Sequence, residues 1–243
     1  MMNVVAIIPA RYGSTRFPGK PLALIDGVPM IERVVRRVES AGVVDRVIVA
    51  TDDKRIEDVV LGFGGEVVMT STQCVNGTER CVEALVQISP RPDAVINVQG
   101  DEPFVHPEQL EELKRLINLP NATIATLAHP MKAADKGQED KNRVKVVQDC
   151  EGHAVRFSRN SIPPSGEPWL QHVGLYAYTS CALEDLVKLD ATELEMRESL
   201  EQVRWLDHGW KIHLGLTHHK TPSVDTPEDL EKIKVLLQAG ESL

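Results

Sequence analysis

The segment from Val4 to Leu22 constrains this chain most, because a buried strand runs directly into a basic, glycine-rich loop. Val4–Ile8 is apolar and partly β-branched, which is typical of a strand inside a parallel sheet. Arginine and lysine bring positive charge to phosphate oxygens, and glycine lets backbone N–H groups approach them. We therefore predict anion binding at the carboxyl edge of an α/β sheet, rather than a solvated surface loop. The loop residues concerned are Arg11, Gly13, Ser14, Thr15, Arg16, Gly19 and Lys20.

The loop has neither of the two common phosphate-binding spacings, that of the P-loop or that of the dinucleotide-binding fold. Its sequence PARYGSTRFPGKPL, at positions 9–22, resembles the signature of the sugar-activating cytidylyltransferases. Within these it is most similar to the 3-deoxy-D-manno-octulosonate (Kdo) cytidylyltransferase family. The resemblance covers nearly the whole chain, in order, and returns at Asn97–Pro103, Phe157–Arg159, His172–Tyr178, Leu200–Arg204 and Val224–Leu230.

Composition is that of a globular protein, with 243 residues, 42% hydrophobic and 26% charged. No apolar run approaches the length of a membrane span, and the chain begins with a strand rather than a basic leader. We therefore expect a cytoplasmic protein without membrane insertion. The net charge of −9 argues against non-specific nucleic-acid binding. The cysteines have no metal-ligand spacing, so we expect reduced, structural thiols at Cys74, Cys81, Cys150 and Cys181.

Strands and helices alternate in the first half of the chain, which predicts a wound parallel sheet. We expect strands at 46–51, 66–69 and 93–98, helices over 29–41 and from an N-cap at Asp53 to Leu61, and a third helix capped by Thr78. Beyond Pro120 the pattern changes to antiparallel ribbons, and later helices are expected at 184–189 and 194–206.

The fold class is therefore α/β. The resemblance implies a three-layer, Rossmann-like nucleotide-diphospho-sugar transferase fold, with a mixed, mostly parallel sheet and a small β-rich insertion within residues 121–180. We expect one domain, 1–243, with a CTP-binding half at 1–120 and an acceptor-sugar and dimerisation half at 121–243. The resemblance also implies a homodimer.

Carboxylates follow two of the expected strands. Gly100 lets the chain turn after the strand at 93–98, and Asp101 then projects at the edge where the basic loop lies. A carboxylate that faces a triphosphate needs a divalent cation between them. By resemblance Asp225, ahead of a helix with Thr226 as N-cap and Pro227 at its first position, is the second Mg²⁺ ligand. A plain helix-leading aspartate is the alternative, and Asp52 is a further candidate to face the site.

The resemblance implies two further sets of residues. The catalytic residues are Arg11, Arg16, Lys20, Asp101 and Asp225, and the contacts to CTP are Pro9, Ala10, Ser14, Gly77, Thr78, Arg80, Gln99 and Gly100. Arg80 has a solvated position in the first helical turn as its alternative.

The acceptor sugar is assigned to the second half. The match at Phe157–Arg159 implies that Arg159 binds the sugar's carboxylate, and the other implied sugar contacts are His172, Tyr176, Glu201 and Gln202. An ion pair between Glu201 and Arg204 is an equal alternative. The family's arginine after Ile162-Pro163 is absent here, and Glu167 stands nearby. His208, His213, His218 and His219 lack a ligand spacing and are assigned to edge-strand or loop positions.

The resemblance thus implies that CTP and Kdo react to give CMP-Kdo and pyrophosphate, for lipopolysaccharide biosynthesis. The alternatives are a cytidylyltransferase for 8-amino-Kdo, where Glu167 would pair with the amine, or for a sialic-acid-like sugar. A non-catalytic nucleotide-sugar-binding regulator is the alternative from another class.

Overall fold

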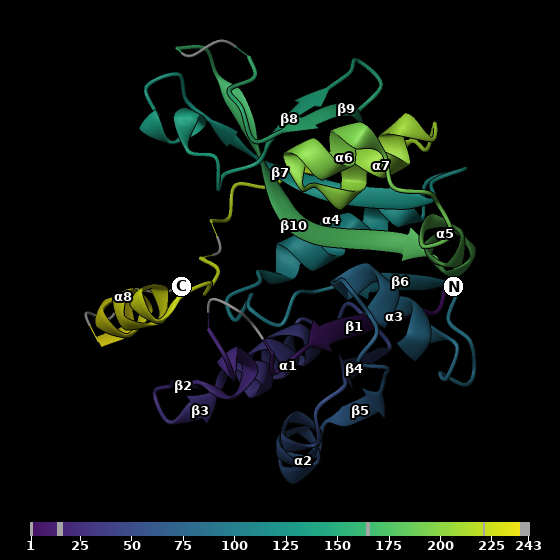
Figure 1. Ribbon diagram of the computed structural model, residues 1–243, viewed down its shortest axis with the longest axis vertical. Coiled ribbons are helices and arrows are strands. Elements are labelled where there is room, and N and C mark those ends of the chain that lie inside the picture. The colour runs from purple at the N-terminus through teal and green to yellow at the C-terminus, as the bar shows by residue number, and fades with distance from the viewer. Residues whose placement is uncertain (1, 14–16, 164–165, 221, 239–243) are drawn as a thin grey trace. The chain divides into compact units, whose positions relative to one another are not determined.

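The computed structural model describes residues 2–13, 17–163, 166–220 and 222–238 (Figure 1). Three of the predicted loop residues, Ser14, Thr15 and Arg16, lie outside the described residues. The chain forms two compact units, which we call the first unit, residues 1–111 with 220–243, and the second unit, residues 112–219. Their boundary in the sequence falls within helix α4 (Pro107–Ile117).

The first unit contains a parallel sheet in the strand order β5-β4-β1-β6. The four strands are β1 (Val4–Ala10), β4 (Arg46–Thr51), β5 (Glu66–Met69) and β6 (Ala94–Asn97). Every residue of β1 is buried, as expected for a strand in the middle of a parallel sheet. Because all four strands run in one direction, the residues that follow β1, β4 and β6 gather at the same edge.

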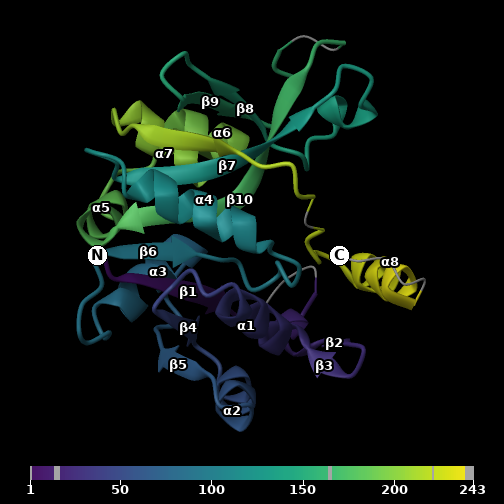
Figure 2. The same ribbon diagram turned by 180° about the vertical axis from the view of Figure 1, so that it is seen from behind.

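Three helices connect these strands: α1 (Met30–Ser40), α2 (Lys54–Gly62) and α3 (Gly77–Leu85). Right-handed crossovers from β1 to β4 and on to β5 place α1 and α2 on one face. The return from β5 to β6 runs the other way, so α3 covers the opposite face, as Figures 1 and 2 show from the two sides. The predicted three-layer α/β arrangement is confirmed.

Short polar side chains fix where these helices begin. The Asp53 side chain accepts a hydrogen bond from the backbone N–H of Arg55, as predicted for an N-cap. The helix α3 is capped by Asn76, whose Oδ1 accepts from the N–H of Glu79 at 2.8 Å. The predicted cap at Thr78 is therefore wrong by two residues, since Asn76 reaches the same donor and leaves Thr78 inside the first turn.

The C-terminal segment belongs to the first unit. Helix α8 (Pro227–Gln238) begins at the predicted residue, with Thr226 Oγ1 accepting from Asp229 N–H at 3.2 Å. The 3₁₀ turn η1 (Lys20–Leu22) and the hairpin of β2 (Leu24–Ile25) and β3 (Val28–Pro29) lead into α1, and α8 packs against Ile25 of β2 and Met30 of α1. The shared apolar cluster consists of Ile25, Met30, Phe104, Val224, Leu230 and Ile233. This burial holds the segment just before α8 against residues near the start of the chain.

The second unit is mainly antiparallel. Its strands pair in the order β10-β7-β11-β9-β8, and β8 also pairs with β10, so the pairings close into a ring. Only β7 and β11 pair in parallel among these described strands, so the mostly parallel sheet that we predicted is found in the first unit alone. The strands are β7 (Ile124–Met131), β8 (Lys145–Gln148), β9 (His153–Ser158), β10 (Trp169–Thr179) and β11 (Ile212–Leu216).

The helical elements of the second unit are η2 (Lys136–Glu139), α5 (Ser180–Leu186), α6 (Glu193–Glu198) and α7 (Glu201–Asp207). The predicted single helix over 194–206 is two helices, because Ser199 adopts a left-handed backbone conformation with φ 51°. This break ends α6 and leaves Leu200 as the N-cap of α7.

The cysteines are free thiols, two of them buried (Cys74, Cys81) and two exposed (Cys150, Cys181). Burial raises the pKa of the Cys74 thiol to about 11, so this group stays protonated and unreactive at neutral pH. Of the helices that the structure describes, none combines the length and apolar character needed to cross a bilayer.

Candidate active site

The ammonium group of Lys20 lies between two carboxylates in the first unit. Its Nζ is 2.6 Å from Asp101 Oδ2 and 3.5 Å from Asp225 Oδ1. The three side chains come from η1, from the turn after β6 and from the segment before α8, so they are far apart in the sequence. Lys20 is 12% exposed, Asp101 27% and Asp225 39%, so the cluster opens to solvent on the carboxylate side.

Close backbone contacts place these groups. The N–H of Val224 donates to Asp101 O at 3.0 Å, which fixes Asp225 beside the turn after β6. A Cβ on Gly100 would lie 3.0 Å from Pro9 O, so the absence of a side chain there lets this turn pack against β1.

The basic loop is held at its two ends. The N–H of Gly19, at φ +73°, donates to Tyr12 O at 2.9 Å and closes the loop just before Lys20. The Arg55 guanidinium lies over the Tyr12 ring, 3.3 Å from its centroid, and its Nη2 bonds Asp53 Oδ2 at 2.6 Å. The helix α2 therefore supports the loop through one stacked ring. Arg11, at the start of the loop, is exposed.

Several predicted CTP contacts meet where β1, β6 and α3 come together. A Cβ on Gly77 would lie 3.3 Å from both Pro9 Cγ and Gln99 Oε1, so these three residues are neighbours. A Cβ on Gly100 would lie 3.6 Å from Ala10 Cβ, which adds these two positions to the same edge of the sheet. Thr78 is buried in the first turn of α3. The N-terminus of α3 and the basic loop together give this edge a positive end suited to phosphate.

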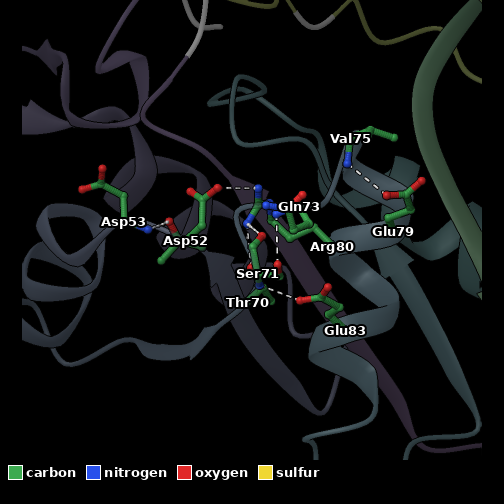
Figure 3. Close-up of polar contacts among 10 residues, drawn as sticks. Asp52, Asp53, Thr70, Ser71, Gln73, Val75, Glu79, Arg80 and Glu83 are labelled. Atoms are coloured by element: carbon green, nitrogen blue, oxygen red, sulfur yellow. Dashed lines mark hydrogen bonds and ion pairs between the residues drawn. The ribbon is translucent and has the colours of Figure 1, made fainter.

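Arg80 is buried and bonded within the protein, as Figure 3 shows. Its Nη2 donates to Asp52 Oδ2 at 2.9 Å and its Nη1 to Thr70 Oγ1 at 2.6 Å. Its side chain is 3% exposed, so the solvated position that we kept as an alternative is wrong. Asp52 was our further candidate to face the site, and its carboxylate is paired with Arg80 instead. Arg80 thereby joins the ends of β4 and β5 to α3, and a CTP contact from it stays a prediction.

The predicted acceptor residues lie in the second unit. Arg159 Nε donates to Glu198 O at 2.7 Å, Nη1 to Lys141 O at 3.0 Å and Nη2 to Ser199 O at 3.2 Å. A guanidinium carries five N–H donors. Within the described residues, two of the Arg159 donors therefore remain for a ligand, on a group whose orientation is fixed.

Sequence reasoning missed two charged groups beside Arg159. Lys145 is fully buried, and its Nζ donates to Asp140 O at 2.8 Å and Arg159 O at 2.9 Å. Burial lowers the pKa of Lys145. Glu198 is buried and accepts from Arg159 N–H at 2.9 Å. For Lys145, the signal that the sequence offered was a lysine within the predicted strand, directly before the apolar residues Val146 and Val147.

His172 and Tyr176 belong to an aromatic cluster. The His172 ring lies 5.1 Å from Phe157 and 5.4 Å from Tyr176, centroid to centroid, and its Nε2 is 3.0 Å from Thr126 Oγ1. Burial lowers the pKa of His172 to about 3, so the ring is neutral at pH 7. Burial also raises the pKa of Tyr176 well above its ordinary value. Any contact from this pair to a sugar is therefore one between neutral groups.

The helix α7 carries the remaining predicted sugar contacts. Arg204 Nη2 lies 3.1 Å from Glu195 Oε1 and 3.6 Å from Glu201 Oε1, so the ion pair that we considered for Glu201 is formed. Gln202 is buried at 6% exposure. Glu167 is exposed.

The carboxylates at Lys20 have the chemistry of a hard-cation site. Asp101 and Asp225 each direct one oxygen at the same cationic group, so a single small cation can contact both. Carboxylate oxygens are the ligands that Mg²⁺ prefers. The two aspartates exceed the one lysine in formal charge, so the cluster can accept further positive charge.

The chain matches known proteins over its whole length. A cytidylyltransferase family model matches residues 5–212. The 3-deoxy-manno-octulosonate cytidylyltransferase of Parabacteroides distasonis is 47% identical over 98% of this chain and 99% of its own length. The protein of the same name from Phocaeicola vulgatus is 44% identical, with 99% of both chains covered. Among solved structures, CMP:2-keto-3-deoxy-manno-octonic acid synthetase complexed with CTP has a TM-score of 0.92 at 40% identity, covering 98% of this chain and 100% of that chain.

We expect Arg80→Met to lower the free energy of unfolding by about 3–5 kcal/mol, because it leaves Asp52 half-buried without its partner. Urea unfolding measures this loss. The control is Arg115→Met, which removes an exposed pair with Glu112 and should cost about 1 kcal/mol or less. Equal, small losses in both variants would show that Arg80 has no structural role.

We expect the free energy of unfolding to depend on pH through His172. Its pKa is about 3 when folded and about 6.5 when unfolded, so only the unfolded chain takes up this proton between those values. The stability that His172 confers is complete above pH ~6.5 and falls by about 1.4 kcal/mol per pH unit towards pH ~3. Urea unfolding of wild type and His172→Asn from pH 7 to 5 measures this, with exposed His208→Asn as control. A pH-independent difference between wild type and His172→Asn would contradict the assignment.

Proposed function

The chain belongs to the 3-deoxy-manno-octulosonate cytidylyltransferase family, and we propose that it transfers CMP from CTP to Kdo with release of pyrophosphate, which activates the sugar for lipopolysaccharide biosynthesis. The observation that carries the proposal is the cluster of Lys20, Asp101 and Asp225. It stands at the carboxyl ends of parallel strands, where α/β sheets bind ligands.

In the proposed reaction the anomeric hydroxyl oxygen of the sugar bonds to the α-phosphorus of CTP. The bond from that phosphorus to pyrophosphate breaks, and the hydroxyl proton passes to solvent. Two anionic substrates must be held together, so positive groups that are already in position lower the barrier. Lys20, which η1 and the closed loop hold in place, faces the phosphates, and Arg11 at the loop's start can reach them from the exposed side. Arg16 has the same proposed role but lies outside the described residues.

We propose that Asp101 and Asp225 hold Mg²⁺. Two oxygens already directed at one cation, and an excess of negative charge, support this proposal. When bound, the metal would offset charge on the phosphate oxygens and lower the pKa of the attacking hydroxyl. Lys20 then remains bonded to Asp101 and keeps that carboxylate oriented.

For the acceptor, we propose that Arg159 binds the sugar's carboxylate. Its two remaining donors and its three fixed hydrogen bonds suit planar, two-point recognition of a carboxylate. Buried Lys145 supports this assignment, because it donates a hydrogen bond to Arg159 O and adds positive charge close to the Arg159 guanidinium. No observation among the described residues favours an amino sugar, since Glu167 is exposed.

Three further proposals follow from the family and from the sequence. These are a homodimer, a cytoplasmic location, and CTP and Kdo as small-molecule substrates. Sedimentation of the full chain measures the first directly.

We expect Asp101→Asn and Asp225→Asn each to lower kcat by on the order of 10²-fold or more, because each removes a charged oxygen ligand of the proposed Mg²⁺ that would offset the charge of the phosphates. Pyrophosphate release from CTP and Kdo, measured over a range of Mg²⁺ concentrations, checks this. Exposed Asp58→Asn on α2 is the matched control and should react as the wild type does.

Circular dichroism must show the same fold in all three variants. Near-wild-type turnover in both active-site variants would refute the assignment of the two carboxylates. Turnover with a different ulosonic acid but not with Kdo would leave the site assignment intact and refute the acceptor.

A further inference from the structure

The turn between β8 and β9 brings three metal-ligating side chains together in the second unit. The ligand atoms of Asp149, Glu151 and His153 all lie within 4.8 Å of one another. His153 Nδ1 is 3.5 Å from Asp149 Oδ2 and 3.6 Å from Glu151 Oε2. Both distances lie in the range of ion pairs and are longer than the usual N···O separation of a hydrogen bond.

The separations suit a small metal ion. Two ligands bound at about 2.0–2.1 Å to tetrahedral zinc lie about 3.3–3.4 Å apart. The two distances to His153 Nδ1 exceed this by only a few tenths of an ångström. Glu151, 68% exposed, lies at the solvent side and leaves a path for the ion to enter.

The backbone fixes the central carboxylate. Asp149 Oδ1 accepts from the N–H of Glu151 at 2.9 Å and from the N–H of His153 at 2.8 Å. These bonds hold one oxygen to the turn and direct Oδ2 towards the imidazole. A ligand carboxylate whose second oxygen is hydrogen-bonded in this way is already oriented for a metal.

A second histidine stands beside the trio on a different strand. His213 of β11 is directly opposite His153 of β9 in the antiparallel ladder, and their ring centroids are 4.7 Å apart. Side chains at directly opposed positions lie on the same face of the sheet. A second imidazole therefore stands beside His153 on the same face of the sheet, while the ligand atoms that lie within 4.8 Å of one another are those of the trio.

We propose that Asp149, Glu151, His153 and His213 form a zinc site, separate from the cluster at Lys20. The mixture of imidazole and carboxylate ligands suits Zn²⁺ better than Mg²⁺, which prefers oxygen alone. The bound ion links the β8–β9 turn to β11 and so braces the ring of strands that carries Arg159. This proposal does not rest on the proposed reaction.

The test is calorimetric titration of ZnCl₂ into the untagged, metal-free full chain. We expect saturable binding that weakens by at least about tenfold in His153→Asn and in Glu151→Gln, since each loses a ligand. Glu151 is exposed, so its variant should fold even if His153→Asn does not. Co²⁺ in place of Zn²⁺ should give the intense visible absorption of four-coordinate cobalt.

Two controls identify the ligands. Cys150→Ser removes the thiol within the same turn, and exposed His208→Asn removes an imidazole elsewhere. Both should keep the wild-type affinity. The proposal is overturned if Glu151→Gln and His153→Asn also keep that affinity, if Cys150→Ser loses it, or if cobalt shows only weak six-coordinate absorption. Absence of binding would leave Asp149 and Glu151 as ion-pair partners of His153 and overturn the proposal equally.

Discussion

The placement of one ammonium group between two carboxylates is the interaction on which the proposed site depends. Lys20 contacts Asp101 at 2.6 Å and Asp225 at 3.5 Å, and each of the three comes from a different part of the chain. Two carboxylates this close to one point repel each other unless positive charge lies between them. The lysine supplies that charge without substrate, and the excess negative charge leaves room for a divalent cation with CTP.

The structure around this cluster explains how it forms. The apolar contacts of α8 with residues near Ile25 and Met30 bring the C-terminal segment back to the first unit. The hydrogen bond from Val224 to Asp101 then sets the two carboxylates side by side. Burial of apolar surface thus stabilises a local accumulation of charge that would be unfavourable alone. In the second unit, backbone carbonyl oxygens accept hydrogen bonds from Arg159 and Lys145 and so stabilise an accumulation of positive charge.

Sequence patterns predicted those features that local chemistry determines. The strands Arg46–Thr51 and Glu66–Met69 begin and end at the predicted residues, and α8 begins at Pro227, because apolar runs and caps act over a few residues. The break at Ser199 was not predicted, since the apolar spacing continues through it. Three other features depend on how strands pair, which spacing along the chain does not reveal. They are the buried pair of Arg80 and Asp52, the burial of Lys145, and the opposition of His153 to His213.

The most direct test of the central claim is the gain in unfolding free energy that CTP with Mg²⁺ confers on wild type and on Asp225→Asn. A ligand that binds only the folded state stabilises it by RT ln(1 + [L]/Kd), which is about 2.7 kcal/mol at a concentration 100 times the Kd. We expect that gain in the wild type only when both CTP and Mg²⁺ are present, and most of it to be absent in Asp225→Asn. An equal gain in both proteins, or a full gain from CTP without Mg²⁺, would contradict the account.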